Sequence, residues 1–91
     1  MKQISHFING EFVAGREGRR FDKRSPLDNR VIASVSEAGR DEVNAAVAAA
    51  RAALEGPWGR MTVTERTELL YAVANEINRR FDDFVAAEVA D

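Results

Sequence analysis

Hydrophobic and polar positions follow two different periods along the chain, and the change lies near residue 36. In residues 3–36, short apolar or β-branched stretches alternate with turn residues. In residues 40–90, apolar side chains recur every three or four positions, which places them on one face of a helix. The pattern predicts an α/β segment, with a β-hairpin and strands in residues 1–36 and three helices in residues 40–91.

The strand region opens with a predicted β-hairpin. Phe7-Ile8 and Phe12-Val13 flank Asn9-Gly10-Glu11, and an Asn-Gly pair tolerates the positive φ angles of a type I′ turn. Beyond the hairpin, we expect Phe21 to be the buried residue of a short strand. Val31-Ile32-Ala33-Ser34-Val35 predicts another strand, because it is apolar and β-branched.

The helices of the second region are marked by their first residues. The first begins near Asp41-Glu42, because acidic residues suit the positive end of a helix dipole. The second begins at Thr62, where Glu65 completes a capping box. The third begins near Asp82-Asp83, and no glycine, proline or basic turn stops it before Asp91. We therefore expect residues 1–91 to be part of a longer chain and to contain no complete domain.

The apolar faces of these helices support that expectation. A chain of 91 residues buries only about 60–65% of its unfolded surface, so its core is marginal. We expect the apolar faces to need the rest of a larger domain, and the isolated chain to expose a sizeable apolar patch.

The net charge of −2 argues against nucleic-acid binding, because it leaves no basic excess to neutralise phosphates. The local exception is the basic segment Arg16, Arg19, Arg20, Lys23 and Arg24. It contains no interleaved aromatics that could stack on bases, so we interpret it as a solvated loop. We therefore keep nucleic-acid binding only as the least favoured of three hypotheses about function.

Composition limits the chemistry further. The chain has no cysteine, which excludes disulfides and thiol nucleophiles. No apolar run is long enough for a signal peptide or a membrane span, so we expect a cytoplasmic protein. His6 is the single histidine, and it lacks the partners of a metal site or of a serine nucleophile. No glycine-rich phosphate motif is present. We expect no catalytic and no cofactor-binding residue in this segment.

Two residues, one between the first and second helices and one inside the second, have an expected structural role. Trp58 follows a Gly-Pro turn, and we expect it to fill a gap between helices. Arg66 lies in the first turn of the second helix, which is unfavourable for a cation, so we expect an acidic partner outside the segment.

Several motifs, taken in order, resemble one family over essentially all 91 residues. They are Phe7-Ile8-Asn9-Gly10-Glu11-Phe12, Ser25-Pro26 before Val31-Ile32, Asp41-x-Val43 leading to Ala48–Ala53, Trp58, Arg66 with Leu69-Leu70, and Glu88–Asp91. The chain resembles the N-terminal segment of the NAD(P)-dependent aldehyde dehydrogenase superfamily, with Ser25 in place of the usual asparagine. Glu37–Arg40 and Gly56–Met61 are most similar to the branch of 2-hydroxymuconic and aminomuconic semialdehyde dehydrogenases.

The resemblance implies a parent enzyme that oxidises a small-molecule aldehyde, here a semialdehyde from aromatic catabolism, to a carboxylate with NAD. The family's cysteine nucleophile, glutamate base, asparagine and nucleotide-binding lysine all come later than Asp91, so the 91 residues alone are expected to be inactive. The parent is expected to be a homodimer or homotetramer that binds neither nucleic acid nor membranes. This segment would be scaffold that packs on the dinucleotide-binding domain.

One minor site is also implied by the resemblance. Some members of the family bind a monovalent cation through a backbone carbonyl and an aspartate, and the matching positions are Lys23 and Asp91. Lys23 replaces the commoner threonine, so its carbonyl alone would serve.

A second reading from another functional class stays open. The 91 residues could be a free-standing small helical module that binds a partner protein through its exposed helix faces. The two readings differ in whether the helices bury one another.

Overall fold

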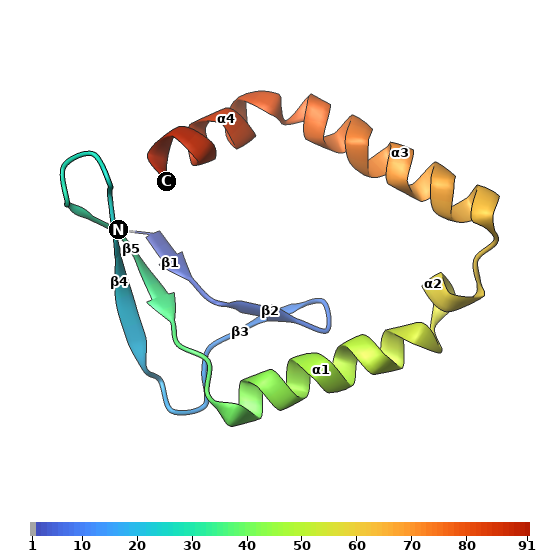
Figure 1. The fold of residues 1–91 in the computed structure, drawn as a ribbon, viewed down its shortest axis with the longest axis horizontal. Coiled ribbons are helices and arrows are strands. Elements are labelled where there is room, and N and C mark those ends of the chain that lie inside the picture. Colours follow the sequence, from blue (N-terminus) through green and yellow to red (C-terminus); the bar gives the residue numbers. More distant parts are fainter. Residues whose placement is uncertain (1) are drawn as a thin grey trace. The chain divides into compact units, whose positions relative to one another are not determined.

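The computed structural model describes residues 2–91, which form five strands and four helices (Figure 1). The elements in order are β1 (Lys2–Ile4), β2 (His6–Ile8), β3 (Glu11–Val13), β4 (Arg20–Arg24), β5 (Val31–Ser36), α1 (Arg40–Leu54), α2 (Pro57–Arg60), α3 (Val63–Arg79) and α4 (Phe81–Ala90). The chain divides into two compact units, one up to Ala53 and one from Leu54 to Asp91.

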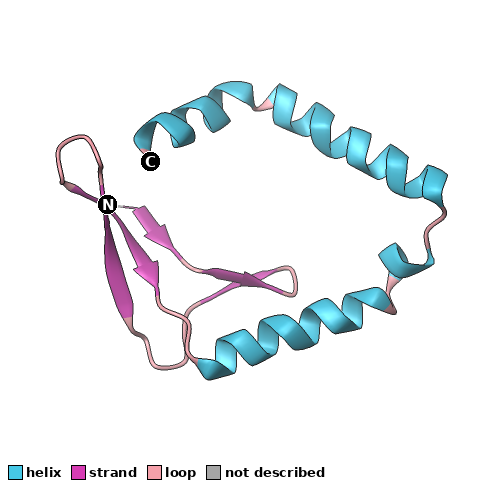
Figure 2. Ribbon diagram, in the orientation of Figure 1, coloured by secondary structure: helices cyan, strands magenta, loops and turns pink. Residues whose placement is uncertain are grey.

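A three-stranded sheet in the order β1-β5-β4 forms one part of the first unit (Figure 2). The central strand β5 pairs in parallel with β1, where Lys2 faces Ala33, and antiparallel with β4, where Phe21 faces Val35. The strand β5 was predicted from its β-branched residues. The strand β1 was not predicted, because its three residues are exposed and carry no alternating pattern.

The β2–β3 hairpin confirms the prediction from Asn9-Gly10. His6 pairs with Val13 and Ile8 with Glu11, and the two turn residues have φ angles of 53° and 80°. Positive φ at both central positions defines the tight turn that matches the twist of the flanking strands.

One arginine joins all three strands of the sheet. The Arg20 guanidinium on β4 donates from Nε to Ser34 Oγ at 2.7 Å and from Nη1 to Ser36 Oγ at 2.8 Å. Its Nη2 donates to the carbonyls of Ser34 at 2.6 Å and Ile4 at 3.4 Å. The planar fork of arginine suits several acceptors at once. Arg20 therefore links the edge strands β1 and β4 through β5.

In the second unit, α3 begins with the predicted capping box. The Glu65 amide donates to Thr62 Oγ1 at 3.1 Å, and the Thr62 amide donates to Glu65 Oε1 at 3.0 Å. Hydrogen bonds from Thr62, first from its backbone amide and then from its side chain, hold the pKa of Glu65 below its usual value. The last helix, α4, begins at Phe81, one residue before the predicted acidic pair.

The short helix α2 was not predicted, because Gly56-Pro57 was interpreted only as a turn. Pro57 occupies the first turn of α2, where its missing amide hydrogen costs nothing. Gly59 follows, and a Cβ there would lie 1.8 Å from the Leu54 carbonyl oxygen. Only glycine allows this approach of two backbone segments.

Arg66 finds its partners inside the segment, which corrects our expectation of an outside acidic partner. Its Nη2 donates to the carbonyls of Trp58 at 3.1 Å and Gly59 at 3.3 Å. Its guanidinium carbon lies 5.2 Å from the centroid of the Trp58 ring. The carbonyl end of α2 carries partial negative charge, so it attracts a cation. Arg66 thus caps α2 from the first turn of α3.

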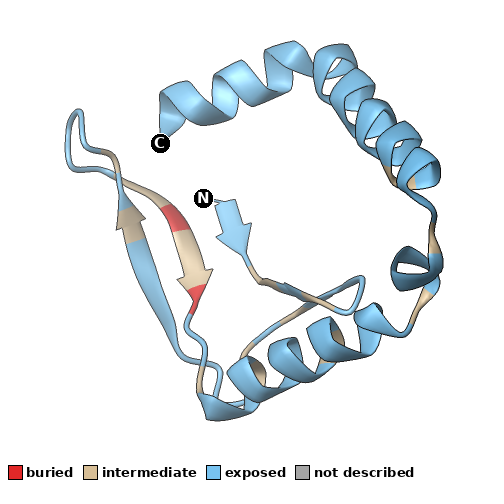
Figure 3. Ribbon diagram, turned by 45° about the vertical axis from the view of Figure 1, so that its right-hand side comes forward, coloured by how far each residue is buried: buried red, intermediate tan, exposed pale blue. Residues whose placement is uncertain are grey.

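Apolar burial is minimal within residues 2–91 (Figure 3). Ala33 is the one buried hydrophobic residue there, and Ser36, three positions later in β5, is the buried polar residue. Phe21 is 52% exposed, so the prediction that it is buried was wrong: β4 is an edge strand, and no described element covers Phe21. The helix faces that the periodicity identified are equally open. No helix in this part of the chain is both long and apolar enough to cross a bilayer.

We predict that Gly59→Ala destabilises the α2 turn. In the complete gene product that carries residues 1–91, the added Cβ forces the Leu54 backbone away and lowers the free energy of unfolding by about 1–3 kcal/mol. Urea denaturation measures the change. Thr64→Ala, an exposed substitution in α3, is the control and should shift stability by less than about 0.5 kcal/mol.

We also predict that Thr62→Ala costs about 1 kcal/mol, because the Glu65 amide loses its acceptor. A carboxyl with a lowered pKa stabilises the fold above its usual value and loses that contribution as pH falls through its lowered pKa. The difference in stability between the wild type and Glu65→Gln should therefore shrink as pH falls below 4.5, the usual value for this side chain. A difference that grows in acid would contradict this account. Denaturation curves at several pH values decide.

Candidate functional site

The surface of the first unit with the most varied chemistry lies between the β2–β3 hairpin and α1. Three adjoining hollows occupy this groove, of about 250, 250 and 310 Å³. Ile8 lines all three. The helix contributes mostly small side chains: Ala45, Ala46, Ala49, Ala50 and Ala53. These alanines leave room along the helix, so the groove has an apolar floor.

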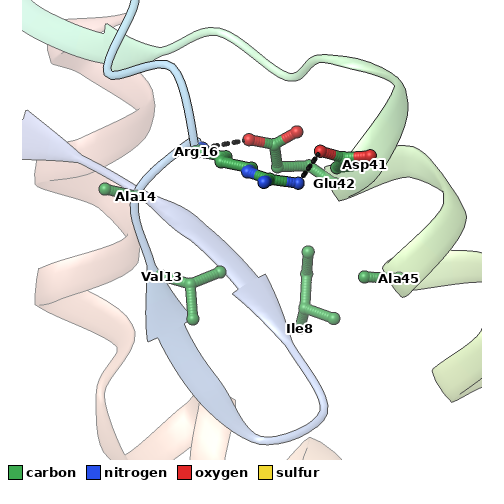
Figure 4. A pocket seen from close by; sticks show the side chains of 7 residues that line it. All are labelled: Ile8, Val13, Ala14, Arg16, Asp41, Glu42 and Ala45. Carbon is green, nitrogen blue, oxygen red and sulfur yellow. Dashed lines mark hydrogen bonds and ion pairs between the residues drawn. The ribbon is translucent and has the colours of Figure 1, made fainter.

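One end of the groove is polar (Figure 4). The Arg16 amide, in the loop after β3, donates to Glu42 Oε1, and the Gly39 amide donates to Glu42 Oε2 at 3.2 Å. The Arg16 guanidinium donates from Nη1 to Asp41 Oδ2 at 2.9 Å. Glu42 therefore ties the loop after the hairpin to the first turn of α1.

These donors keep Glu42 charged. The pKa of Glu42 is lowered first by the Arg16 amide, then by its own backbone amide, the Gly39 amide and the positive charge of His6, while partial desolvation opposes them. Hydrogen bonds from amides favour the ionised form of a carboxyl. The sequence-based interpretation gave Glu42 only a helix-dipole role. The available signal was Gly39, three residues before Glu42, which is the spacing of a capping box.

Gly15 lies where the loop crosses Glu42. A Cβ at Gly15 would lie 2.8 Å from the Glu37 carbonyl oxygen, 3.1 Å from Glu42 Oε1 and 3.7 Å from His6 Nε2. The side chain of His6 therefore comes close to the same carboxylate. Its Nε2 is buried and has no hydrogen-bond partner in the described structure.

Three serines of the first unit serve the fold. Ser34 and Ser36 accept hydrogen bonds from Arg20, and Ser25 Oγ accepts one from the Leu27 amide at 3.2 Å. Within residues 2–91 no group of three or more histidine, aspartate or glutamate side chains gathers as a metal site would require.

The basic segment that suggested nucleic-acid binding is engaged in internal contacts. Arg16 forms an ion pair with Asp41, and Arg20 on β4 donates a hydrogen bond to Ser36 Oγ on β5. Arg24 Nη1 donates to the Asn29 carbonyl at 3.1 Å. Arg19 pairs with Glu17 at 2.6 Å. Arg20, Lys23 and Arg24 lie in strand β4, so the interpretation of the whole segment as a solvated loop was wrong, and its arginines serve structural contacts.

The two residues of the expected cation site lie in different units. Lys23 is half-buried on β4, where it pairs with Ala33, and the register shifts between Lys23 and Arg24. Asp91 follows α4, and its amide donates to the Ala87 carbonyl at 3.2 Å. The pairing of these two residues around a cation stays a prediction.

Comparison with known proteins identifies the family. The model of the aldehyde dehydrogenase family matches residues 12–91. Over all 91 residues, the chain is 58% identical to 2-hydroxymuconic semialdehyde dehydrogenase of Pseudomonas sp. (strain CF600), and it covers 19% of that protein. It is 46% identical over 91 residues to 2-aminomuconic 6-semialdehyde dehydrogenase of Pseudomonas sp., of which it covers 18%.

Solved structures agree. The NAD⁺ complex of aldehyde dehydrogenase from Bacillus cereus superposes with a TM-score of 0.91 at 41% identity, over 99% of this chain and 18% of that one. The chain thus spans about a fifth of the length of the relatives that it matches. Both the order of its motifs and its backbone geometry are those of a single family, and the chain belongs to the aldehyde dehydrogenase family.

Proposed function

We propose that residues 1–91 form the N-terminal scaffold of an NAD-dependent enzyme that oxidises a muconic-type semialdehyde to a carboxylate. The observation that carries the proposal is the 58% identity over the whole chain to a 2-hydroxymuconic semialdehyde dehydrogenase. A related semialdehyde enzyme matches at 46% over the same length.

The scaffold role follows from what the residues supply and what they leave open. They offer no cysteine to attack an aldehyde. The hydroxyl groups that form hydrogen bonds serve caps, turns, helix and strand contacts: Ser25, Ser34, Ser36, Thr62 and Thr67. Their apolar faces are uncovered, so they suit packing on a larger body. Residues 1–36 and 40–91 would then be parts of one aldehyde dehydrogenase domain that neither completes.

NAD does not fit the residues described here. A dinucleotide site needs a glycine-rich turn that opens a helix. The glycines with positive φ are Gly10 in the hairpin turn and Gly18 in a loop before β4, and neither precedes a helix. We propose NAD as the cofactor of the complete enzyme, since a relative of the same fold was solved as an NAD⁺ complex. No step of the reaction is assigned to these residues.

The cation site and the assembly belong to the same proposal. The Lys23 carbonyl and the Asp91 carboxylate would bind a monovalent cation in the complete enzyme, which would assemble as a homodimer or homotetramer. The bulge after Lys23 supports a site there, because a register shift disrupts the regular ladder beside that residue.

We predict that the complete gene product reduces NAD⁺ with 2-hydroxymuconic semialdehyde and that residues 1–91 alone do not. Absorbance at 340 nm follows the reaction, with propanal as the matched substrate. The kcat/KM for the semialdehyde should exceed that for propanal by roughly tenfold or more, because specific polar contacts discriminate strongly. A preference for propanal would contradict the substrate class, and no turnover of either aldehyde would contradict the activity itself.

The partner-binding alternative is favoured by one observation: Thr67, Leu70, Tyr71 and Ala74 line an open hollow of about 330 Å³ on α3. Calorimetry of the isolated 91 residues separates the two functions. We predict no sharp cooperative transition, because Ala33 is the one apolar residue buried within residues 2–91. A sharp transition from a monomer would favour the free-standing module.

A further inference from the structure

The turn between β2 and β3 places a side-chain amide next to an uncrowded backbone nitrogen. Asn9 and Gly10 form its tip, with φ angles of 53° and 80°, and both residues are exposed. Within residues 2–91, neither the Asn9 side chain nor the Gly10 backbone amide has a hydrogen-bond partner. A Cβ at Gly10 would meet no atom within 4 Å. The Gly10 nitrogen is therefore neither shielded nor held by an acceptor.

The hairpin that carries this tip is short. In the described part of the chain, β2 and β3 pair over three residues each and form a two-stranded sheet. A sheet of this size is marginally stable in water by itself, so its turn opens at a low cost in free energy. Opening allows the Asn9 backbone to rotate until its side-chain carbonyl carbon meets the Gly10 nitrogen.

Asn29 provides a matched contrast, because it is also exposed and also has a positive φ, of 63°. The amide of the next residue, Arg30, donates to Asp28 Oδ1 at 3.1 Å. The Asn29 amide donates to the Ser25 carbonyl at 2.9 Å, and the Asn29 carbonyl accepts from Arg24 Nη1 at 3.1 Å. The nitrogen after Asn29 is thus held in place, whereas the nitrogen after Asn9 is free to move.

We propose that Asn9-Gly10 is a site of spontaneous deamidation, at which the chain modifies itself. The Gly10 nitrogen gives its proton to solvent and attacks Cγ of Asn9, so that a new N–Cγ bond closes a five-membered succinimide ring. The Cγ–Nδ2 bond breaks, and Nδ2 takes up a proton and leaves as ammonia. Water then opens the ring at either carbonyl and gives aspartate or isoaspartate at position 9. The reaction needs no cofactor, because its two reacting groups belong to one dipeptide.

Isoaspartate changes the length of the turn. Its backbone runs through the former side chain, which adds one methylene group and leaves a negative charge at the tip. The unmodified two-residue turn holds Phe7 opposite Phe12, with ring centroids 4.9 Å apart. Because loop length sets the register of a hairpin, the modified hairpin is less stable than one with ordinary aspartate at position 9.

Peptide mapping of the complete gene product, held at physiological temperature in neutral buffer, tests the proposal. Trypsin cleaves after lysine and arginine, so Asn9 falls in the peptide 3–16 and Asn29 in the peptide 25–30, each as the single asparagine. Asn9 should lose its amide at least roughly tenfold faster than Asn29, since the turn at Asn9 opens more readily. Electron-transfer fragmentation should identify isoaspartate among the products. Loss at Asn9 that is no faster than at Asn29, or aspartate as the sole product, would overturn the proposal.

Two variants test the separate steps. Gly10→Asp introduces a residue that tolerates positive φ, but its Cβ crowds the attacking nitrogen, so Asn9 should keep its amide. Asn9→Asp carries the charge without the longer turn, so the isoaspartate form of the wild type, separated by chromatography, should melt at a lower temperature than this variant. Undiminished loss in Gly10→Asp would contradict ring closure, and equal melting would contradict the effect on the hairpin. Far-UV circular dichroism confirms that each variant is folded, and no readout depends on dehydrogenase activity.

Discussion

The apolar faces of this chain lack a cover of their own, and most other features follow from that constraint. Val43 and Val47 on α1 are 53% and 48% exposed, and Leu70 on α3 is 61% exposed. Apolar area contributes about 25 cal/mol per Å² only when it leaves water. In residues 2–91 little of it does, so hydrophobic burial does not fix the conformation of these elements by itself.

Charged side chains that bind several backbone or side-chain groups, here called polar clasps, hold the local geometry instead. Arg20 binds acceptors on two neighbouring strands, Glu42 collects amides from two loops, and Arg66 binds the carbonyl end of α2. Each clasp contains one charged side chain and at least one backbone group. A charged partner strengthens such bonds, and a backbone partner fixes the path of the chain. The clasps prepare surfaces of defined shape, which suits a segment that packs on a larger body.

How far the sequence predicted this arrangement depended on the range of each interaction. The Asn9-Gly10 turn and the Thr62–Glu65 capping box involve residues within three positions of each other, and both were predicted correctly. The strand β1 exists because it pairs with β5, and its own three residues carry no signal. Phe21 has the composition of a buried strand residue, yet burial depends on what covers the strand. Arg66 was misjudged because its acceptors lie on another helix.

The same contrast applies to the functional residues. The motif order pointed to the correct family because each motif is local and their spacing is preserved. The junction of His6, Gly15 and Glu42 joins three separate parts of the chain, and its members have ordinary local roles when taken singly. Lys23 and Asp91 were proposed together from resemblance alone, and they belong to different compact units of the chain.

The parallel pairing of β1 with β5 has a consequence for synthesis of the protein. Lys2 faces Ala33, about 30 residues later in the chain, and at 5–20 residues per second the ribosome needs roughly 2–6 s to make that stretch. A hairpin forms in about 1–10 μs, so β2 and β3 can pair long before β1 has a neighbour. During that interval the first strand is an unpaired edge, open to other nascent chains. Its lysine is a charge of the kind that discourages such contacts.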